Sequence, residues 1–292
     1  MKRKDFILFI MFVFILILLL LVSCGPKKYT PVSSAVRRNG VDGPQGGAGD
    51  NEQILKQKEI ESIKIPDKVS QILKTHDDAN WDEDAAGYNL TGANQLFAKV
   101  TYTIFIKGKF LYWLYNDETD EIRAKESKES RREFYLACEY NANFIKAFAG
   151  VVNKLVATDE LLEKNKGEIV FFLENVRSYA RFYYDVYSIL KEKQNKLDSL
   201  PLKKLQWLKA GLLKFEKEQQ ELHKIIQLII NDYNNDTPIN SSEPTHHLKS
   251  SDTLPDEIME YWIKDTHRGE CHRKFSEIIK TAIMIKDLLK GL

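Results

Sequence analysis

One stretch of large apolar residues, spaced alternately three and four positions apart, limits what this chain can fold into more than any other feature. It comprises Leu205, Leu208, Leu212, Phe215, Gln219, Leu222, Ile226, Ile229 and Tyr233, all apolar except Gln219. This spacing places the whole set on one face of a single α-helix. Because the pattern continues for about four heptads, the helix has to bury that face against other helices. The stretch therefore predicts a helical bundle with coiled-coil-like packing.

Two further long helices are predicted before this stretch. The first starts at Ser130-Arg-Arg-Glu133, which matches a capping box, and its buried face is predicted to be Phe134, Cys138, Ala142, Ile145, Phe148, Ala149, Val152, Leu155 and Val156. Thr158 is predicted to cap a short continuation that Gly167 interrupts. The second long helix carries Ile169, Phe172, Leu173, Val176, Ala180, Tyr183, Val186, Tyr187 and Leu190 on one stripe.

Shorter elements lie on either side of these helices. They are helices at 51–65 and 67–74, an acidic loop at 77–91, a turn at 198–201, a polar loop at 234–253 and a last helix at 255–290. Pro66 separates the first two helices, and Pro255 opens the last one. Together with the long helices, they make helix the dominant prediction.

Residues 92–115 admit two interpretations. The runs 102–106 and 110–115 are aromatic and β-branched around Lys107-Gly108-Lys109, which is typical of a β-hairpin. A helix would instead place Leu96, Val100, Ile104, Phe105, Leu111 and Leu114 on one side. We favour the helix, because the remainder of the chain is helical.

The predicted fold class is therefore all-α, a single antiparallel bundle of about five to seven helices joined mostly by short turns. We expect this bundle to occupy residues 51–292 and to follow a signal peptide at 1–23 and a tether at 24–50. The segment 25–50 is rich in Gly, Pro, Ser and Lys and has no apolar periodicity, so we expect it to be disordered.

The first 24 residues predict the location of the protein. Lys2-Arg3-Lys4 precedes an apolar run at 6–21, and Leu21-Val22-Ser23-Cys24 ends it. This order is that of a secretory signal, and its end resembles the lipobox of bacterial lipoproteins, which implies cleavage after Ser23 and acylation of Cys24. The alternative is an uncleaved membrane anchor, since about 17–25 apolar residues span a bilayer. A bare anchor has no need of the Leu-Val-Ser-Cys end.

The charge balance bears on nucleic-acid binding, and the cysteine content bears on disulfide formation. Lys and Arg number 43 and Asp and Glu 42, so bulk electrostatic attraction to nucleic acid is not expected. Apart from Cys24, the chain has Cys138 and Cys271. They could form one disulfide across a long loop or remain separate thiols buried as small hydrophobes, and we favour the second.

The sequence offers few candidates for a metal site, a tyrosine-rich interface or a catalytic site. His267 and Cys271 lie four positions apart, with His272 beside them and His246 and His247 in the preceding loop, yet we expect no metal because a zinc site needs more convergent ligands. The tyrosines Tyr135, Tyr140, Tyr179, Tyr183, Tyr184 and Tyr187 are expected to pack in the bundle rather than to form an interface. No phosphate loop, dinucleotide fingerprint or catalytic triad pattern occurs, so we expect no enzyme and no cofactor.

The lipobox at Leu21–Cys24, the Gly/Ser tether and the Lys-, Asn- and Ile-rich helical domain together resemble the plasmid-encoded outer-surface lipoproteins of the Lyme-disease spirochaetes, Borrelia. Two groups are similar, the virulent-strain-associated lipoproteins and the helical complement-regulator-acquiring paralogues. The resemblance implies an outer-membrane lipid anchor, surface display and, in some members, binding of complement regulators or other host proteins. It carries over no ligand-binding residue.

The sequence thus favours a lipid-anchored outer-surface protein that binds a host macromolecule in adhesion or immune evasion. The alternative is a structural or assembly lipoprotein that faces the periplasm and has no host ligand. Gly25 follows the acylated Cys where a retention signal would place Asp, which favours export. The oligomeric state and the binding face are not predicted.

Overall fold

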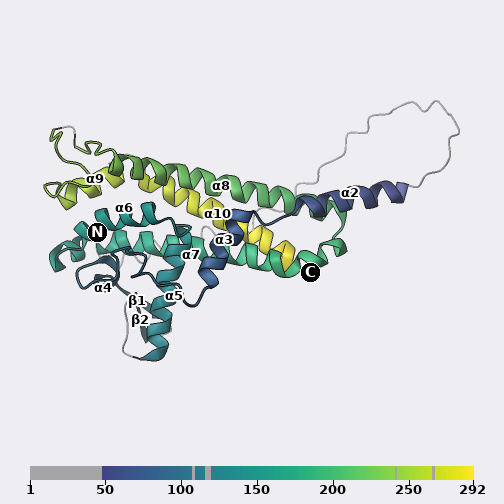
Figure 1. Ribbon diagram of the computed structural model, residues 1–292, viewed down its shortest axis with the longest axis horizontal. Helices are drawn as coiled ribbons and strands as arrows, with labels where there is room; N and C mark the ends of the chain where they lie inside the picture. Colours follow the sequence, from purple (N-terminus) through teal and green to yellow (C-terminus); the bar gives the residue numbers. More distant parts are fainter. Residues whose placement is uncertain (1–47, 107–108, 116–119, 241, 265–266) are drawn as a thin grey trace. The chain divides into compact units, whose positions relative to one another are not determined.

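The computed structural model describes residues 48–292 except 107–108, 116–119, 241 and 265–266 (Figure 1). The elements are α2 (Ala48–Ser62), α3 (Asp67–Asp77), α4 (Leu96–Lys99), β1 (Thr101–Ile106), β2 (Lys109–Leu114), α5 (Glu121–Ala137), α6 (Ala142–Leu155), α7 (Asp159–Lys193), the 3-10 helix η1 (Gln194–Ser199), α8 (Leu202–Asn234), α9 (Pro255–Lys264) and α10 (His267–Lys290). The predicted signal peptide, its cleavage site and Cys24 lie outside the described residues.

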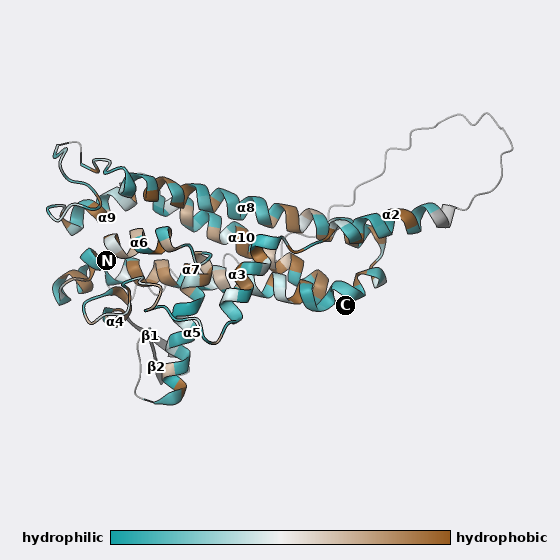
Figure 2. Cartoon of the chain, viewed as in Figure 1, coloured by the Kyte–Doolittle hydropathy of each residue, from teal (hydrophilic) through white to brown (hydrophobic). Residues whose placement is uncertain are grey.

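Three long helices, α7, α8 and α10, form the centre of the bundle and run in alternating directions along the chain (Figure 1). Helix α10 packs against both α7 and α8, α5 packs on the other side of α7, and α2 packs on α8. Apolar residues recur in short stretches along these helices (Figure 2), as amphipathic helices in a bundle require. The predicted helical bundle is confirmed. None of the described helices is both long and apolar enough to cross a membrane.

The long apolar stripe predicted on one helix is the buried face of α8. Leu205, Leu208 and Phe215 have no exposed surface. Gln219, the polar member, is also buried, and its Nε2 donates to the Tyr179 hydroxyl at 3.3 Å. A buried amide of this kind needs such a partner, since an unpaired one would cost about 1–3 kcal/mol.

The tyrosine set packs in the bundle as expected. Tyr135, Tyr179, Tyr183 and Tyr187 are at most 2% exposed. The Tyr183 and Tyr187 rings meet nearly edge to face with centroids 5.2 Å apart, and Tyr187 lies 5.9 Å from Phe215. Burial raises the pKa of all four hydroxyls, so they stay protonated.

The capping box predicted at Ser130 is wrong. The cap of α5 lies ten residues earlier, where the Asp120 carboxylate accepts the Arg123 amide at 2.9 Å, and Ser130 lies inside the helix with its hydroxyl donating to the Glu126 carbonyl. Glu133 is therefore free of a capping role. It accepts hydrogen bonds from Arg177 Nε at 2.7 Å and Arg181 Nε at 2.6 Å, and so joins α5 to α7.

The single helix predicted from 130 to 156 is two helices. Glu139 and Tyr140 adopt left-handed conformations with φ of 51° and 55°, which end α5. Asn141 then caps α6, accepting the Phe144 amide at 3.1 Å. The apolar period continues across this corner because both helices bury the same kind of face, so the period alone does not reveal the break.

Two further boundaries were predicted along the next helix, a cap at Thr158 and an interruption at Gly167. Thr158 caps α7 as predicted, accepting the Leu161 amide, but Gly167 lies within that helix and does not interrupt it. A single glycine costs a helix only about 1 kcal/mol, which the packing of α7 outweighs. The helix predicted at 255–290 corresponds to α9 and α10, which lie on either side of residues 265–266; that pair lies outside the described residues.

The helix that we favoured for residues 92–115 is also wrong. In the described part of this stretch only Leu96–Lys99 is helical, and β1 and β2 form an antiparallel hairpin in which Thr101 pairs with Leu114 and Ile106 pairs with Lys109. The β-branched and aromatic composition of the two runs outweighed the helical context. The hairpin contacts α5 through β2.

The acidic loop is fixed to the bundle by arginines of α5. Arg132 donates to the backbone carbonyls of Thr75 at 3.0 Å, His76 and Asp78, which are carbonyls at the end of α3. The Arg132 guanidinium also lies 5.5 Å from the centre of the Trp81 ring. These contacts give the lone Trp of the predicted acidic loop a structural role.

Candidate functional site

The end of the bundle at which α8 leads into α9 contains an apolar cavity of about 140 Å³. Helices α6, α7, α8, α9 and α10 surround it, together with the 235–254 loop that connects α8 to α9. Its lining residues are Phe144, Ala147, Phe148, Val151, Val152, Leu155, Glu168, Ile169, Phe172, Ile226, Ile229, Ile230, Tyr233, Leu248, Ile258, Met259, Tyr261, Trp262 and Cys271. We call this space the apolar cavity.

The sequence supplies the walls of the apolar cavity by helical periodicity. The residues from α6 recur at spacings of three and four, as do those from the last turns of α8. Those last turns belong to the same stripe that is packed tightly further back along α8. The cavity therefore lies where the stripe continues but its partner helices no longer meet it closely.

An empty space of this size is expensive. At about 24 cal/mol per Å³, a closed void of about 140 Å³ would cost about 3 kcal/mol of stability, and the cost here is smaller because the space is partly open to the surface. Protein interiors contain few voids larger than a water molecule. Water does not compensate for the cost, because it needs two to four polar partners and the walls are apolar.

Glu168 is the charged residue in the wall, and its carboxylate is already paired. Its Oε1 accepts from Trp262 Nε1 at 3.0 Å and from Arg268 Nε at 2.8 Å. Tyr261, also in the wall, donates its hydroxyl to Asp232 Oδ2 at 2.7 Å. Glu168 and Tyr261 thus have their partners within the protein.

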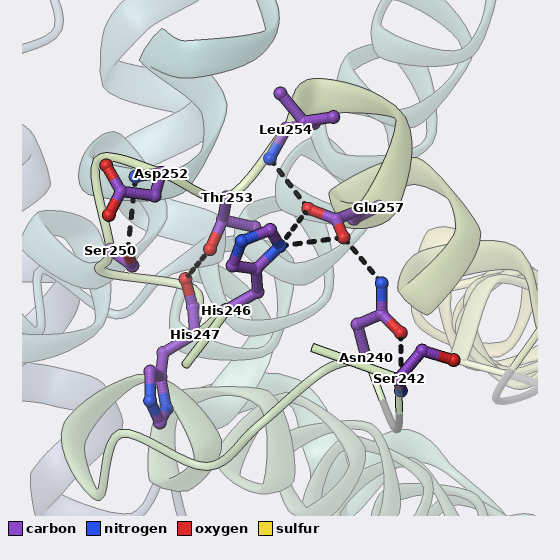
Figure 3. Close-up of polar contacts among 9 residues, drawn as sticks. All are labelled: Asn240, Ser242, His246, His247, Ser250, Asp252, Thr253, Leu254 and Glu257. Carbon is purple, nitrogen blue, oxygen red and sulfur yellow. Dashed lines mark hydrogen bonds and ion pairs between the residues drawn. The ribbon is translucent and has the colours of Figure 1, made fainter. Parts of the chain in front are cut away.

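The 235–254 loop is held in place by Glu257, in the first turn of α9 (Figure 3). Its carboxylate accepts from Asn240 Nδ2 at 2.6 Å and the Leu254 amide at 2.8 Å, and both oxygens lie 2.9 Å from His246 Nδ1. The contact with the Leu254 amide is the backward half of a capping box. One carboxylate therefore joins the helix start to both halves of the loop.

The His246–Glu257 pair stabilises the charged form of each partner. The hydrogen bond with Glu257 raises the pKa of His246 above its usual 6.5. The hydrogen bond from His246, followed by those from Asn240 and the Leu254 amide, lowers the pKa of Glu257 to about 2. Figure 3 shows His247 pointing away from this pair.

Lys154 holds the loop from the side of α6. Its ammonium donates to the carbonyls of Leu248 at 2.8 Å and Ser250 at 2.5 Å, and partial burial lowers its pKa. Leu248, which lines the apolar cavity, is 1% exposed. The Thr253 hydroxyl, bonded to the His247 carbonyl at 2.6 Å, completes the turn (Figure 3).

Tyr233 closes one side of the apolar cavity against a glycine. A side chain on Gly150 would collide with the Tyr233 hydroxyl, so only glycine lets this ring lie against the backbone of α6. The Lys249 ammonium lies 5.1 Å from the centre of the same ring. The loop and α6 thus fix Tyr233 from both sides.

The residues weighed as metal ligands have other partners or positions. His246 is paired with Glu257, while Cys271 is 1% exposed and burial raises its pKa to about 12. His272 lies in α10 with its ring 4.6 Å from that of Phe171. Among residues 48–292, apart from the gaps, no three His, Cys, Asp or Glu side chains are placed to hold a metal.

The two cysteines are free thiols in different parts of the fold. Cys138 lies at the end of α5 and Cys271 lies in α10, each buried among apolar side chains. No disulfide joins these two cysteines in the structure.

The apolar cavity was missed in the sequence because its walls come from five helices and a loop. No local pattern marks it, because Ala147, a small residue in its wall, follows the same helical period as the packed positions.

Comparison with known proteins found matches to proteins of Borrelia. A family described as Borrelia Bbcrasp-1 domain containing protein (PFam54_60) matches residues 94–290. A crystal structure of a C-terminal proteolytic fragment of an outer surface protein from Borrelia burgdorferi is similar over 80% of this chain and 99% of that chain, with 13% identity and a TM-score of 0.46. Among curated proteins, none matches.

Proposed function

The chain belongs to the family of Borrelia proteins that contain a Bbcrasp-1 domain, and on that premise we propose that it is a lipid-anchored outer-surface protein whose helical domain binds a host macromolecule. The family match, which covers residues 94–290, is the observation that carries the proposal. The resemblance of Leu21–Cys24 to a lipobox supports the anchor, with acylation at Cys24 and cleavage after Ser23.

The first experiment concerns location. Protease is added to intact cells and to cells with a permeabilised outer membrane, and the protein is followed with an antibody against the bundle. We expect degradation in intact cells. A chain that is protected in intact cells and degraded only after permeabilisation would overturn surface display and favour a periplasm-facing assembly lipoprotein.

The anchor is tested separately by Cys24→Ala. The variant cannot be acylated, so we expect loss of the lipid mass increment and retention of the leader in mass spectra. If the native protein carries an unmodified Cys24 and its complete leader, the lipid anchor is contradicted. Surface exposure can still be measured in that case.

The second experiment concerns the host ligand. The purified mature protein is immobilised and probed with serum and extracellular-matrix proteins. The first side chain to change is Trp207 of α8, because it is 56% exposed and exposed Trp residues are enriched at binding hot spots. We expect Trp207→Ala to weaken binding at least tenfold without changing the melting temperature.

Ile122→Ala is the matched control for this variant. Ile122 is 71% exposed on α5, so truncating it removes a comparable exposed apolar group from another helix. If no serum or matrix protein binds the folded wild-type chain, the host-binding part of the proposal fails. Equal weakening by both variants would exclude Trp207 as a specific contact.

A further inference from the structure

We infer that the apolar cavity is a binding site for a small uncharged hydrocarbon group, either an aromatic ring or a short alkyl segment. The inference rests on the size of the cavity, on the chemistry of its wall and on the internal pairing of its polar groups. It is independent of the host-binding proposal, since that proposal uses Trp207, which does not line the cavity.

The size of the cavity sets the upper limit for its occupant. A volume of about 140 Å³ is close to that of an engineered apolar cavity in another protein, of about 150 Å³, which stays dry and binds benzene or xenon. The occupant is therefore a group of about six carbon atoms. A larger molecule such as a phospholipid can place only the end of one chain inside and has to leave the remainder outside.

The wall selects for apolar chemistry. Phe148, Phe172 and Trp262 present aromatic surface, and branched residues of α6 and α8 supply the remainder of the lining. Apolar surface removed from water is worth about 25 cal/mol per Å², and a preformed pocket gains this without ordering its own side chains. A rigid aromatic ring fits such a wall well.

The wall also excludes charge. The Glu168 carboxylate is engaged by Trp262 and Arg268, and the Tyr261 hydroxyl is engaged by Asp232. No Lys or Arg side chain is among the lining residues of the cavity, so a ligand carboxylate or phosphate would find no counter-charge in the wall. An anion with the same carbon chain should therefore bind much more weakly than the neutral hydrocarbon.

The experiment compares the full-length chain with variants that fill the cavity. Ala147 is 5% exposed and lines the cavity, so Ala147→Leu places three extra carbon atoms inside it. Ala210→Leu, on the exposed side of α8, is the matched control. The readouts are the melting temperature with and without benzene, and the fluorescence of Trp262 in the wall, obtained as the difference between each chain and its Trp262→Phe variant because the chain has four Trp.

We expect saturating benzene to raise the melting temperature of the wild type and of Ala210→Leu by about 2–4 °C and to change the Trp262 emission. We expect Ala147→Leu to abolish both effects. Should Ala147→Leu fail to fold, Ala147→Val fills less of the space and is expected to reduce the benzene shift. An absent shift in the wild type, or an equal shift in the filled variants, would overturn the inference.

Two further arms identify the chemical source of the group. Hexane and hexanoate have the same chain length, and we expect a shift with hexane and none with hexanoate. Phosphatidylcholine vesicles brominated near the end of the acyl chain quench Trp262 if the occupant is the end of a lipid chain, whereas quenching by free bromobenzene alone identifies a free small molecule. Hexanoate binding as tightly as hexane would contradict the uncharged chemistry proposed for the ligand.

Discussion

The centre of the bundle and its loop end are built from the same amphipathic helices but are packed differently. At the centre, Tyr183, Tyr187 and Phe215 fill the space between α7 and α8 with rings in contact. At the loop end, aromatic residues of α6, α7 and α9 surround the apolar cavity instead. The comparison teaches that an apolar stripe ensures burial but does not ensure complementary packing.

The physical reason lies in the partners of α8. Along its first half, α8 meets the long and continuous helix α10, whose residues Phe275, Ile278 and Ile285 are at most 2% exposed. At its other end, α8 faces α6, α9, Cys271 of α10 and the 235–254 loop, whose side chains line the cavity without filling it. The loop is held largely by polar contacts from Glu257 and Lys154.

The largest expected effect comes from truncating one Phe side chain in each region and comparing the losses of stability. Phe215→Ala removes a ring with no exposed surface from the packed centre, so we expect the free energy of unfolding to fall by about 3–5 kcal/mol. Phe148→Ala removes a half-buried ring beside an existing void, and we expect a loss of about 1–2 kcal/mol, since less packing is disrupted there. Urea denaturation measures both. Equal losses would contradict the comparison.

The next effect concerns the ion pairs that join α5 to α7. Glu133→Gln removes the charge that Arg177 and Arg181 share, with Arg177 only 12% exposed, so we expect a loss of about 2–3 kcal/mol. Lys164 and Asp256 form an exposed pair, and Asp256→Asn should change stability by less than about 1 kcal/mol. Chemical denaturation at matched pH compares the two. A loss for Glu133→Gln no larger than that for Asp256→Asn would show that burial adds nothing.

The third prediction makes the same Ala-to-Leu substitution in each region and expects opposite changes in the free energy of unfolding. Ala147→Leu fills the apolar cavity, and we expect stabilisation by about 0.5–2 kcal/mol. Ala180→Leu adds the same carbons to a site in α7 with no exposed surface, and we expect destabilisation by about 1–3 kcal/mol. Both residues lie in helix interiors, so their helix propensities cancel. The same sign in both thermal unfolding curves would remove the distinction between the regions.

The smallest effect is the pH dependence of the loop. The raised pKa of His246 contributes stability that is complete below 6.5, its unfolded value, and is lost as pH rises through the folded value. The lowered pKa of Glu257 contributes stability above 4.5 that is lost as pH falls toward about 2. We therefore expect the Leu254 amide to be best protected from exchange near pH 5–6 and less protected in mild alkali.

A local probe is needed for this measurement, because other histidines act in the opposite direction. Burial lowers the pKa of His76, His223 and His272, so their protonation below 6.5 favours unfolding. Glu257→Gln is the control, and it should remove the pH dependence of Leu254 exchange after correction for the intrinsic rate. Unchanged dependence in that variant would assign the effect to another group.

The fold was predictable from sequence as far as periodicity carries information. The buried face of α8 and the stripe of α7 appear in the sequence as they appear in the structure, because each helix buries one continuous face. Boundaries were less predictable. Glu139 and Tyr140 adopt left-handed conformations without a Gly to mark them, and Gly167 is tolerated in a helix that tertiary packing stabilises.

The site was predictable only in its parts. The residues around Glu257 include a capping interaction that the helix start implies, but the pairing with His246 depends on how the loop folds back. The apolar cavity depends on small mismatches between helices that are distant in sequence, and no local pattern encodes such mismatches. The hairpin shows the same limit, since short apolar runs fit both periods.

The two buried thiols can report local opening of the fold. Cys271 lies in the wall of the apolar cavity with its pKa raised to about 12, and Cys138 lies at the corner between α5 and α6 with its pKa also raised. A water-soluble reagent that attacks thiolates reaches each sulfur only when its own surroundings come apart. The two labelling rates therefore measure local opening at α10 and at the end of α5 separately, and no substitution in the chain is needed.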